Sequence, residues 1–201
     1  MELMGKPLIS HVFEKVKDIC DEVLIVVGYM DQAEPLLRLF DDKVKVVADS
    51  GELQGPLVGA LAGFENALGE YSLLLPCDTP FLSRQVLMLL FDISVGVDAV
   101  IPRWPGGYIE PLQAVYRTHP ALLAARKALA EKKTDMRSTL QLLKRVRYLS
   151  TMILEELDPR LRTFFNVNTM TDLKRAERIG GPKWQEKNKG DTRSSDIWWS
   201  S

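Results

Sequence analysis

Four short apolar runs, separated by amphipathic segments, constrain the fold of this chain more than any other feature. Each run is continuous and rich in leucine or β-branched residues, as in strands buried on both faces of a parallel sheet. They span residues 23–28, 44–49, 71–78 and 98–104. Between them apolar residues recur at helical spacing. The alternation predicts an α/β three-layer sandwich with a Rossmann-like, mostly parallel sheet.

The second half of the chain departs from this alternation. Residues 108–117 follow the fourth run after a tight Pro-Gly-Gly turn, too short for a helical crossover, so we expect them to pair antiparallel with it. Helices are predicted at 120–132 and 136–146, followed by a strand at 147–153. Ser83 is an N-cap candidate, and Thr169 with Asp172 predicts the start of a last helix.

Composition bounds the function classes. The chain has 201 residues, 46% of them hydrophobic, and a formal net charge of -1, which disfavours nucleic-acid binding driven by bulk charge. Two distant cysteines form no disulfide framework or CxxC metal motif. No apolar stretch reaches the roughly 18 residues of a membrane span, and no signal peptide opens the chain. We therefore expect a cytoplasmic protein that binds neither nucleic acid nor membrane.

Asp49 and Asp78 each stand at the carboxyl end of a predicted strand. Open α/β sheets bind ligands at these ends, and a carboxylate placed there needs a cation, a metal or backbone donors. A carboxylate pair near phosphates is a usual way to hold Mg²⁺. The alternative is that each aspartate only caps the helix or turn that follows. Two such residues in one sheet favour the functional interpretation.

Other candidates lie in polar loops. Gly51 and Gly55 precede a helix opened by Pro56, whose free backbone N–H groups could bind an anion. Asn166 and Asn168 are two residues apart, so in extended backbone both point the same way and could hold a polar substrate; an Asx-turn is the alternative. Glu110 interrupts an apolar strand and could accept substrate hydrogen bonds or form an edge salt bridge.

Four stretches, in their order and spacing, resemble the molybdenum cofactor guanylyltransferases, which have a nucleotide-diphospho-sugar-transferase-type fold. The resemblance covers about residues 3–179, and the related cytidylyltransferases share much of it. The stretches are "GPLVGALAGFENAL", "LLLPCDTPF", "EPLQAVYR" and "FFNVNTMTDL".

The resemblance implies that the protein binds GTP and Mg²⁺ and transfers GMP to molybdopterin. It implies that Asp78 is the catalytic metal ligand and also contacts the nucleotide, together with Asp49. It places Asn166 and Asn168 at the molybdopterin. From their own positions, Gly55 is a further candidate for the nucleotide and Glu110 for the substrate. A homo-oligomer or a cofactor-handling protein partner would be compatible with it.

One departure concerns the start of the chain. The family opens with a strand and a glycine-rich loop, LAGGxSxRMGxDK, before a "GKPLI" segment, which here begins at Gly5. We therefore expect residues 1–180 to form an N-terminally truncated nucleotidyltransferase-like domain without that strand and phosphate loop, and 181–201 to form a disordered tail. Two interpretations stay open: a truncated enzyme, inactive as written, or an inactive relative that binds a partner.

Overall fold

The computed structural model describes residues 1–41, 43–49 and 53–180, so the tail expected at 181–201 and Gly51 lie outside the described residues. The strands are β1 (Glu2–Leu3), β2 (Lys6–Pro7), β3 (Leu24–Val27), β4 (Lys45–Ala48), β5 (Tyr71–Leu74), β6 (Ala99–Arg103), β7 (Ala114–Arg117) and β8 (Val146–Ser150). The helices are α1 (Leu8–Val16), α2 (Ala33–Leu39), α3 (Pro56–Asn66), α4 (Arg84–Asp92), α5 (Thr118–Ala130), α6 (Met136–Leu140), α7 (Thr151–Glu155) and α8 (Met170–Gly180), with 3-10 turns η1 (Met30–Gln32) and η2 (Arg162–Phe164).

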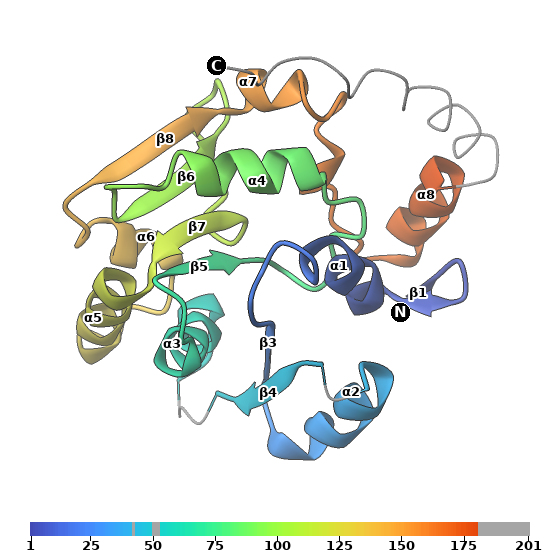
Figure 1. Cartoon of the computed structure of the whole chain (residues 1–201), viewed down its shortest axis with the longest axis horizontal. Helices are drawn as coiled ribbons and strands as arrows, with labels where there is room; N and C mark the ends of the chain where they lie inside the picture. Colours follow the sequence, from blue (N-terminus) through green and yellow to red (C-terminus); the bar gives the residue numbers. More distant parts are fainter. Residues whose placement is uncertain (42, 50–52, 181–201) are drawn as a thin grey trace, which may run out of the picture.

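The larger sheet has the strand order β5-β7-β6-β8 and is mixed (Figure 1). β7 runs antiparallel to β5 and β6, whereas β6 and β8 are parallel. β5, β6 and β8 therefore point the same way, and their carboxyl ends meet at one edge, with the start of β7 beside them. β3 and β4 form a separate parallel pair. The α/β class and the antiparallel partner of β6 are confirmed, and the parallel strands are divided between this mixed sheet and the β3–β4 pair.

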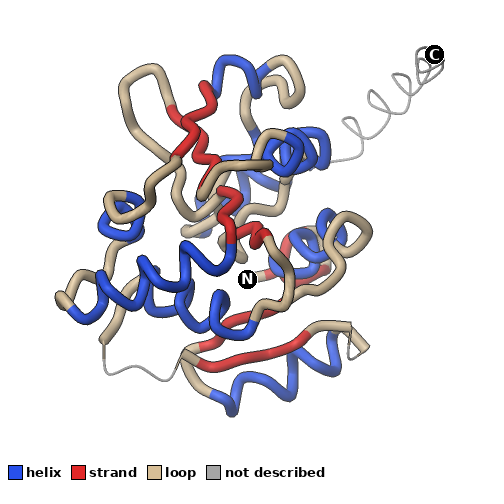
Figure 2. The backbone as a smooth tube through the Cα atoms, turned by 60° about the vertical axis from the view of Figure 1, so that its left-hand side comes forward, coloured by secondary structure: helices blue, strands red, loops and turns tan. Residues whose placement is uncertain are grey.

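Helices cover both faces of the larger sheet, which confirms the predicted layers (Figures 1 and 2). Because side chains alternate along a strand, Ile101 and Tyr116 pack against α3, α5 and α6, while Val100 and Val115 pack against α4 and α7. All four side chains are fully buried. These two apolar layers hold the strand ends of the larger sheet in place.

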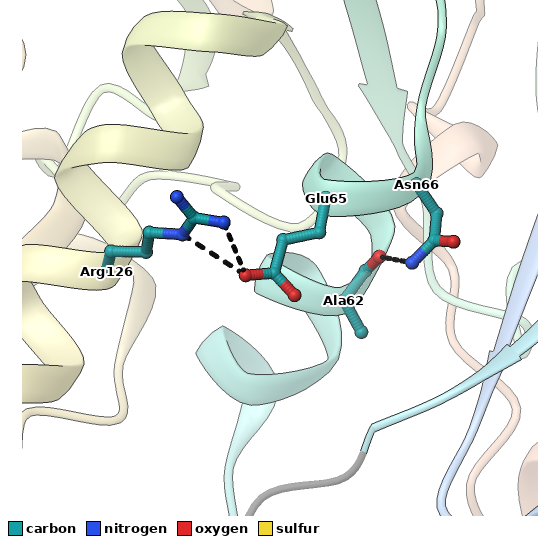
Figure 3. A network of polar contacts seen from close by, with 4 residues as sticks. All are labelled: Ala62, Glu65, Asn66 and Arg126. Atoms are coloured by element: carbon teal, nitrogen blue, oxygen red, sulfur yellow. Dashed lines mark hydrogen bonds and ion pairs between the residues drawn. The ribbon is translucent and has the colours of Figure 1, made fainter.

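The helices α3 and α5 are neighbours on the first of these faces (Figure 3). Their exposed sides are joined by Arg126, whose Nη2 lies 3.0 Å from Oε1 of Glu65. A surface ion pair of this kind contributes little, about 0–1 kcal/mol, so the buried apolar contacts beneath it stabilise the helix pair.

Local sequence signals predicted where helices start more accurately than where strands end. The Ser83 hydroxyl accepts a hydrogen bond from the Val86 amide at the start of α4, and Thr169 and Asp172 bond reciprocally before α8, as predicted. The strand predicted at 147–153 is wrong in its second half, because Ser150 caps α7 and the chain turns helical at Thr151. The short hairpin β1–β2 was not predicted.

A buried carboxylate sets the position of the edge strand β8. Asp98, 7% exposed, precedes β6, and its Oδ2 accepts hydrogen bonds from the Lys144 and Arg145 amides at 3.1 and 3.0 Å. Its own amide donates to the Arg145 carbonyl at 2.7 Å. These bonds connect the segment before β8 to the start of β6 and so align the two parallel strands.

We predict that Asp98→Ala lowers the free energy of unfolding by about 2–3 kcal/mol, because two amides lose a charged acceptor in a partly buried place. Urea denaturation measures the change. Asp92→Ala, on the exposed end of α4, is the control and should stay within about 0.5 kcal/mol. Equal effects of the two substitutions would show that Asp98 does not align β8.

Candidate active site

The loop after β5 presents Asp78 at the edge where the carboxyl ends of β5, β6 and β8 meet. The Asp78 carbonyl accepts a hydrogen bond from the Val167 amide at 2.9 Å, and its Oδ1 lies 3.4 Å from Nδ2 of Asn166, 88 residues later in the sequence. The structure therefore brings two of the predicted site residues together. Burial raises the pKa of Asp78, and hydrogen bonds from its own backbone amide and from Asn166 partly offset this.

The two prolines explain why the chain leaves β5 in this direction. Pro76 fixes its own φ and its carbonyl accepts a hydrogen bond from the Thr79 hydroxyl at 3.1 Å. Thr79 and Pro80 are buried, so the loop cannot fold outward without exposing them. Asp78 is thereby held half-buried beside the solvent.

Residues 163–168 run across the ends of the strands and bring Asn166 to Asp78. Thr163 is buried and has three hydrogen bonds: its amide donates to Asp158, its hydroxyl accepts from the Ser83 amide, and its carbonyl accepts from the Gln113 side chain. Val167 is fully buried, whereas Asn166 and Asn168 are exposed. This alternation confirms that the two asparagines point to the same side.

Glu110 lies at the same edge, between β6 and β7. Its Oε1 accepts a hydrogen bond from the indole Nε1–H of Trp104 at 2.7 Å. The Trp104 ring meets Phe164 edge-on, with 5.7 Å between the ring centroids. Burial raises the pKa of Glu110, and the indole hydrogen bond partly offsets this. Glu110 is thus no edge salt bridge within the described part of the chain.

Asp49 follows β4 in the smaller sheet and is half-buried. Its amide donates to the Val27 carbonyl at 2.8 Å, which extends the β3–β4 ladder. Asp49 and Asp78 therefore belong to different sheets, and whether they flank one crevice stays a prediction. A nucleotide role for Asp49 stays a prediction.

Gly55 precedes α3 with φ +142°, and a Cβ there would lie 2.8 Å from the Thr134 Cβ. The Thr134 carbonyl accepts the Leu57 amide at 3.1 Å, and the Gly55 carbonyl accepts the Val58 amide at 3.1 Å. Two of the amides expected to be free are therefore already engaged. Anion binding by Gly55 stays a prediction that rests on its own N–H.

The side chains near Asp78 limit how a metal ion could be bound. Across residues 1–41, 43–49 and 53–180 no three His, Cys, Asp or Glu side chains gather as a metal site. One carboxylate is nevertheless compatible with Mg²⁺, which usually takes one or two carboxylates and completes its shell with phosphate oxygens and water. Asp78 fits this requirement, because only one of its oxygens is hydrogen-bonded to Asn166.

Two further observations delimit the site. A surface pocket of about 640 Å³, lined by Glu70, Arg117 and His119 among others, lies at the opposite edge of the sheet and contains none of the predicted residues. Ligands of α/β sheets bind at the carboxyl ends instead.

None of the described helices has the length and apolar character needed to cross a membrane.

Sequence reasoning missed Trp104 and Thr163. An aromatic residue directly after a strand and six positions before Glu110 was a usable signal for Trp104. Thr163 had no local signal, because its partners Asp158, Ser83 and Gln113 come from three separate parts of the sequence.

The fold and the site at the strand ends define a nucleotidyltransferase of the nucleotide-diphospho-sugar transferase type. The profile of the family described as "MobA-like NTP transferase domain" matches residues 1–146, and the chain belongs to this family. A "Probable molybdenum cofactor guanylyltransferase" from Methanosarcina acetivorans is 33% identical over 178 residues, covering 86% of this chain and 79% of that protein.

Two further relatives carry names of the same family. A "Molybdenum cofactor guanylyltransferase" from Desulfosudis oleivorans is 34% identical over 176 residues, covering 87% of this chain and 83% of that protein. The crystal structure of molybdopterin-guanine dinucleotide biosynthesis protein A from Archaeoglobus fulgidus is 31% identical. It has a TM-score of 0.76 and covers 89% of this chain and 88% of that one.

We predict that Gly55→Ala lowers the free energy of unfolding by about 1–3 kcal/mol, because an L side chain is strained at this φ and would overlap Thr134. Thermal or urea unfolding measures it. Gly106→Ala is the control, since a Cβ at Gly106 meets nothing within 4 Å. An unchanged Gly55→Ala protein would mean that the segment 131–135 does not pack against the start of α3.

Proposed function

We propose that this nucleotidyltransferase transfers GMP from GTP to molybdopterin. An oxygen of the terminal phosphate of molybdopterin attacks the α-phosphorus of GTP. A new P–O bond forms, the bond between the α-phosphorus and the bridging oxygen breaks, and pyrophosphate leaves. The observation that carries the proposal is the contact between Asp78 and Asn166 at the carboxyl ends of the strands, in a chain whose relatives are named as guanylyltransferases.

Asp78 would hold Mg²⁺ at this edge. When bound, the ion supplies charge neutralisation and a bridge between phosphate oxygens. Asn166 donates to Oδ1, and the other carboxylate oxygen has no side-chain donor among the described residues. Transfer of this kind depends on positioning and charge stabilisation, which Asp78 in the loop after β5 and Asn166 in the segment 163–168 would supply together.

The remaining residues divide between the two substrates. Asn166, Asn168 and Glu110 would bind molybdopterin, because they lie together along residues 163–168 and the β6–β7 connection. Asp49 and Gly55 flank the segment between β4 and α3 and would bind the nucleotide. We propose GTP rather than CTP as the nucleotide because the relatives are named as guanylyltransferases. No described contact favours the cytidylyltransferase or the inactive binding protein.

The cytoplasmic location, a homo-oligomer or protein partner and the domain limits stay predictions. The assay is performed with the 201-residue chain and with a chain extended by any coding sequence in frame before Met1. Each is given GTP or CTP with Mg²⁺ and molybdenum cofactor. Guanine dinucleotide and pyrophosphate support the proposal. Product from CTP alone would make the protein a cytidylyltransferase, and no product in any arm would refute nucleotide transfer.

We predict that Asp78→Asn lowers kcat/KM of the active form by about 100-fold or more, because a neutral amide is a poor Mg²⁺ ligand. Stability should change by no more than about 0.5 kcal/mol, since the amide oxygen can still accept from Asn166. Because burial raises the pKa of Asp78 in the metal-free protein, Mg²⁺ binding should weaken with decreasing pH while an ordinary aspartate would still be ionised.

The control is Asp92→Asn, which lies on α4 away from the site and should keep both the activity and the acid limb of the pH profile. Wild-type turnover in Asp78→Asn would reduce Asp78 to a turn residue.

A further inference from the structure

The carboxylate of Glu110 has more acceptor capacity than the protein uses. It is half-buried, and the indole N–H of Trp104 is its one hydrogen-bond donor among the described residues. An ionised carboxylate offers about four lone-pair sites, and burying it without donors is costly. Its second oxygen, Oε2, has no partner in the described part of the chain. The one buried side-chain oxygen or nitrogen without a partner among the described residues is Oγ1 of Thr139, so Oε2 of Glu110 is open to solvent and a ligand donor can replace water there.

The pair of Trp104 and Glu110 is held rigidly from both sides. The Trp104 amide donates to the Tyr108 carbonyl, and the Trp104 carbonyl accepts from the Gly107 amide, each at 2.8 Å. The Glu110 amide donates to the Pro102 carbonyl at 3.0 Å, and Phe164 packs edge-on against the indole. Neither residue needs to move to present the carboxylate, so little ordering entropy opposes ligand binding.

The pair is linked to Asp78 through residues 164–166. Phe164, which contacts Trp104, precedes Asn166 by two residues, so the chain between them spans at most about 7 Å. Asn166 in turn contacts Asp78. One substrate molecule can therefore reach from the Glu110 carboxylate to the phosphate-binding carboxylate of the proposed site.

We propose that Glu110, oriented by Trp104, binds the N–H edge of a 2-amino-4-oxopyrimidine ring. In such a ring a ring N–H and an exocyclic amino group point the same way, and two parallel N–H donors match the two oxygens of a carboxylate as a guanidinium does. Oε2 accepts one of the two N–H donors. Oε1 accepts the other on its second lone pair, because its first lone pair already accepts the indole N–H of Trp104. Glu110 is the binding residue and Trp104 a positioning residue.

This edge is shared by guanine and by pterins, and the choice of these ligands rests on the proposed function. The residue placement favours the pterin, since Glu110 lies on the side of Asn166 and away from the β3–β4 sheet. Two matched ligand pairs separate the sources. A pterin is compared with a lumazine, in which a carbonyl oxygen replaces the exocyclic amino group, and GTP is compared with ITP, in which a hydrogen replaces it.

Isothermal titration with the 201-residue chain measures all four ligands. The wild type should bind the amino-bearing member of one pair at least 10-fold more tightly than its partner. Glu110→Gln should lower the affinity for that ligand by about 10-fold to 100-fold, because charge-assisted hydrogen bonds are lost. It should also abolish the difference in affinity within the pair. Glu65→Gln, which breaks only the surface ion pair with Arg126 in Figure 3, should change nothing.

Trp104→Phe tests the positioning role. It keeps an aromatic ring against Phe164 but removes the indole donor, so discrimination should fall about threefold to 10-fold while the fold is retained. In the wild type, the NMR signal of the Trp104 indole N–H should shift when the preferred ligand binds, and Glu110→Gln should remove that shift.

Discrimination in the pterin pair assigns Glu110 to molybdopterin, and discrimination in the guanine pair assigns it to GTP. The absence of discrimination in both pairs, or discrimination that survives Glu110→Gln, overturns the proposal. The result is independent of nucleotide transfer: binding dependent on Glu110 without dinucleotide formation refutes only the proposed function. Dinucleotide formation without discrimination refutes only this inference.

Discussion

The buried hydrogen bonds of Thr163 are the constraint on which the site depends. Its amide, hydroxyl and carbonyl bind Asp158, Ser83 and Gln113, which come from the loop after α7, the start of α4 and the segment before β7. A buried residue with all of its polar groups engaged has few alternative conformations. The residues on either side of Thr163 are therefore held in a fixed position across the strand ends.

Two contacts follow from that position. Phe164 reaches Trp104, which holds Glu110, while Val167 enters the core and turns Asn166 toward Asp78. The core around Val167 is completed by Leu3, Leu8, Leu173 and Ala176, so the first hairpin, α1 and α8 support the same segment. Asp78 and Glu110 become parts of one surface because the same short segment contacts Asp78 directly and Glu110 through Trp104.

How much the sequence predicts depends on whether the cause is local. Asp78 after an apolar run, the alternation of Asn166, Val167 and Asn168, and the cap formed by Thr169 and Asp172 were readable because strand ends, period two and capping are short-range effects. The separation of β3–β4 from the larger sheet, the indole donor to Glu110 and the bonds of Thr163 were not. Each joins segments far apart, and spacing alone does not say which segments become neighbours.

The central claim is tested most directly by comparing Thr163→Val with Thr118→Val. Each removes a buried hydroxyl; Thr118 bonds to Gly69 at the opposite edge of the sheet, so both should lose about 1–2 kcal/mol of stability. The account predicts that Thr163→Val alone impairs the discriminating binding at Glu110 and nucleotide transfer in the active form. Equal behaviour of the two variants in binding and transfer, at similar stability, would contradict it.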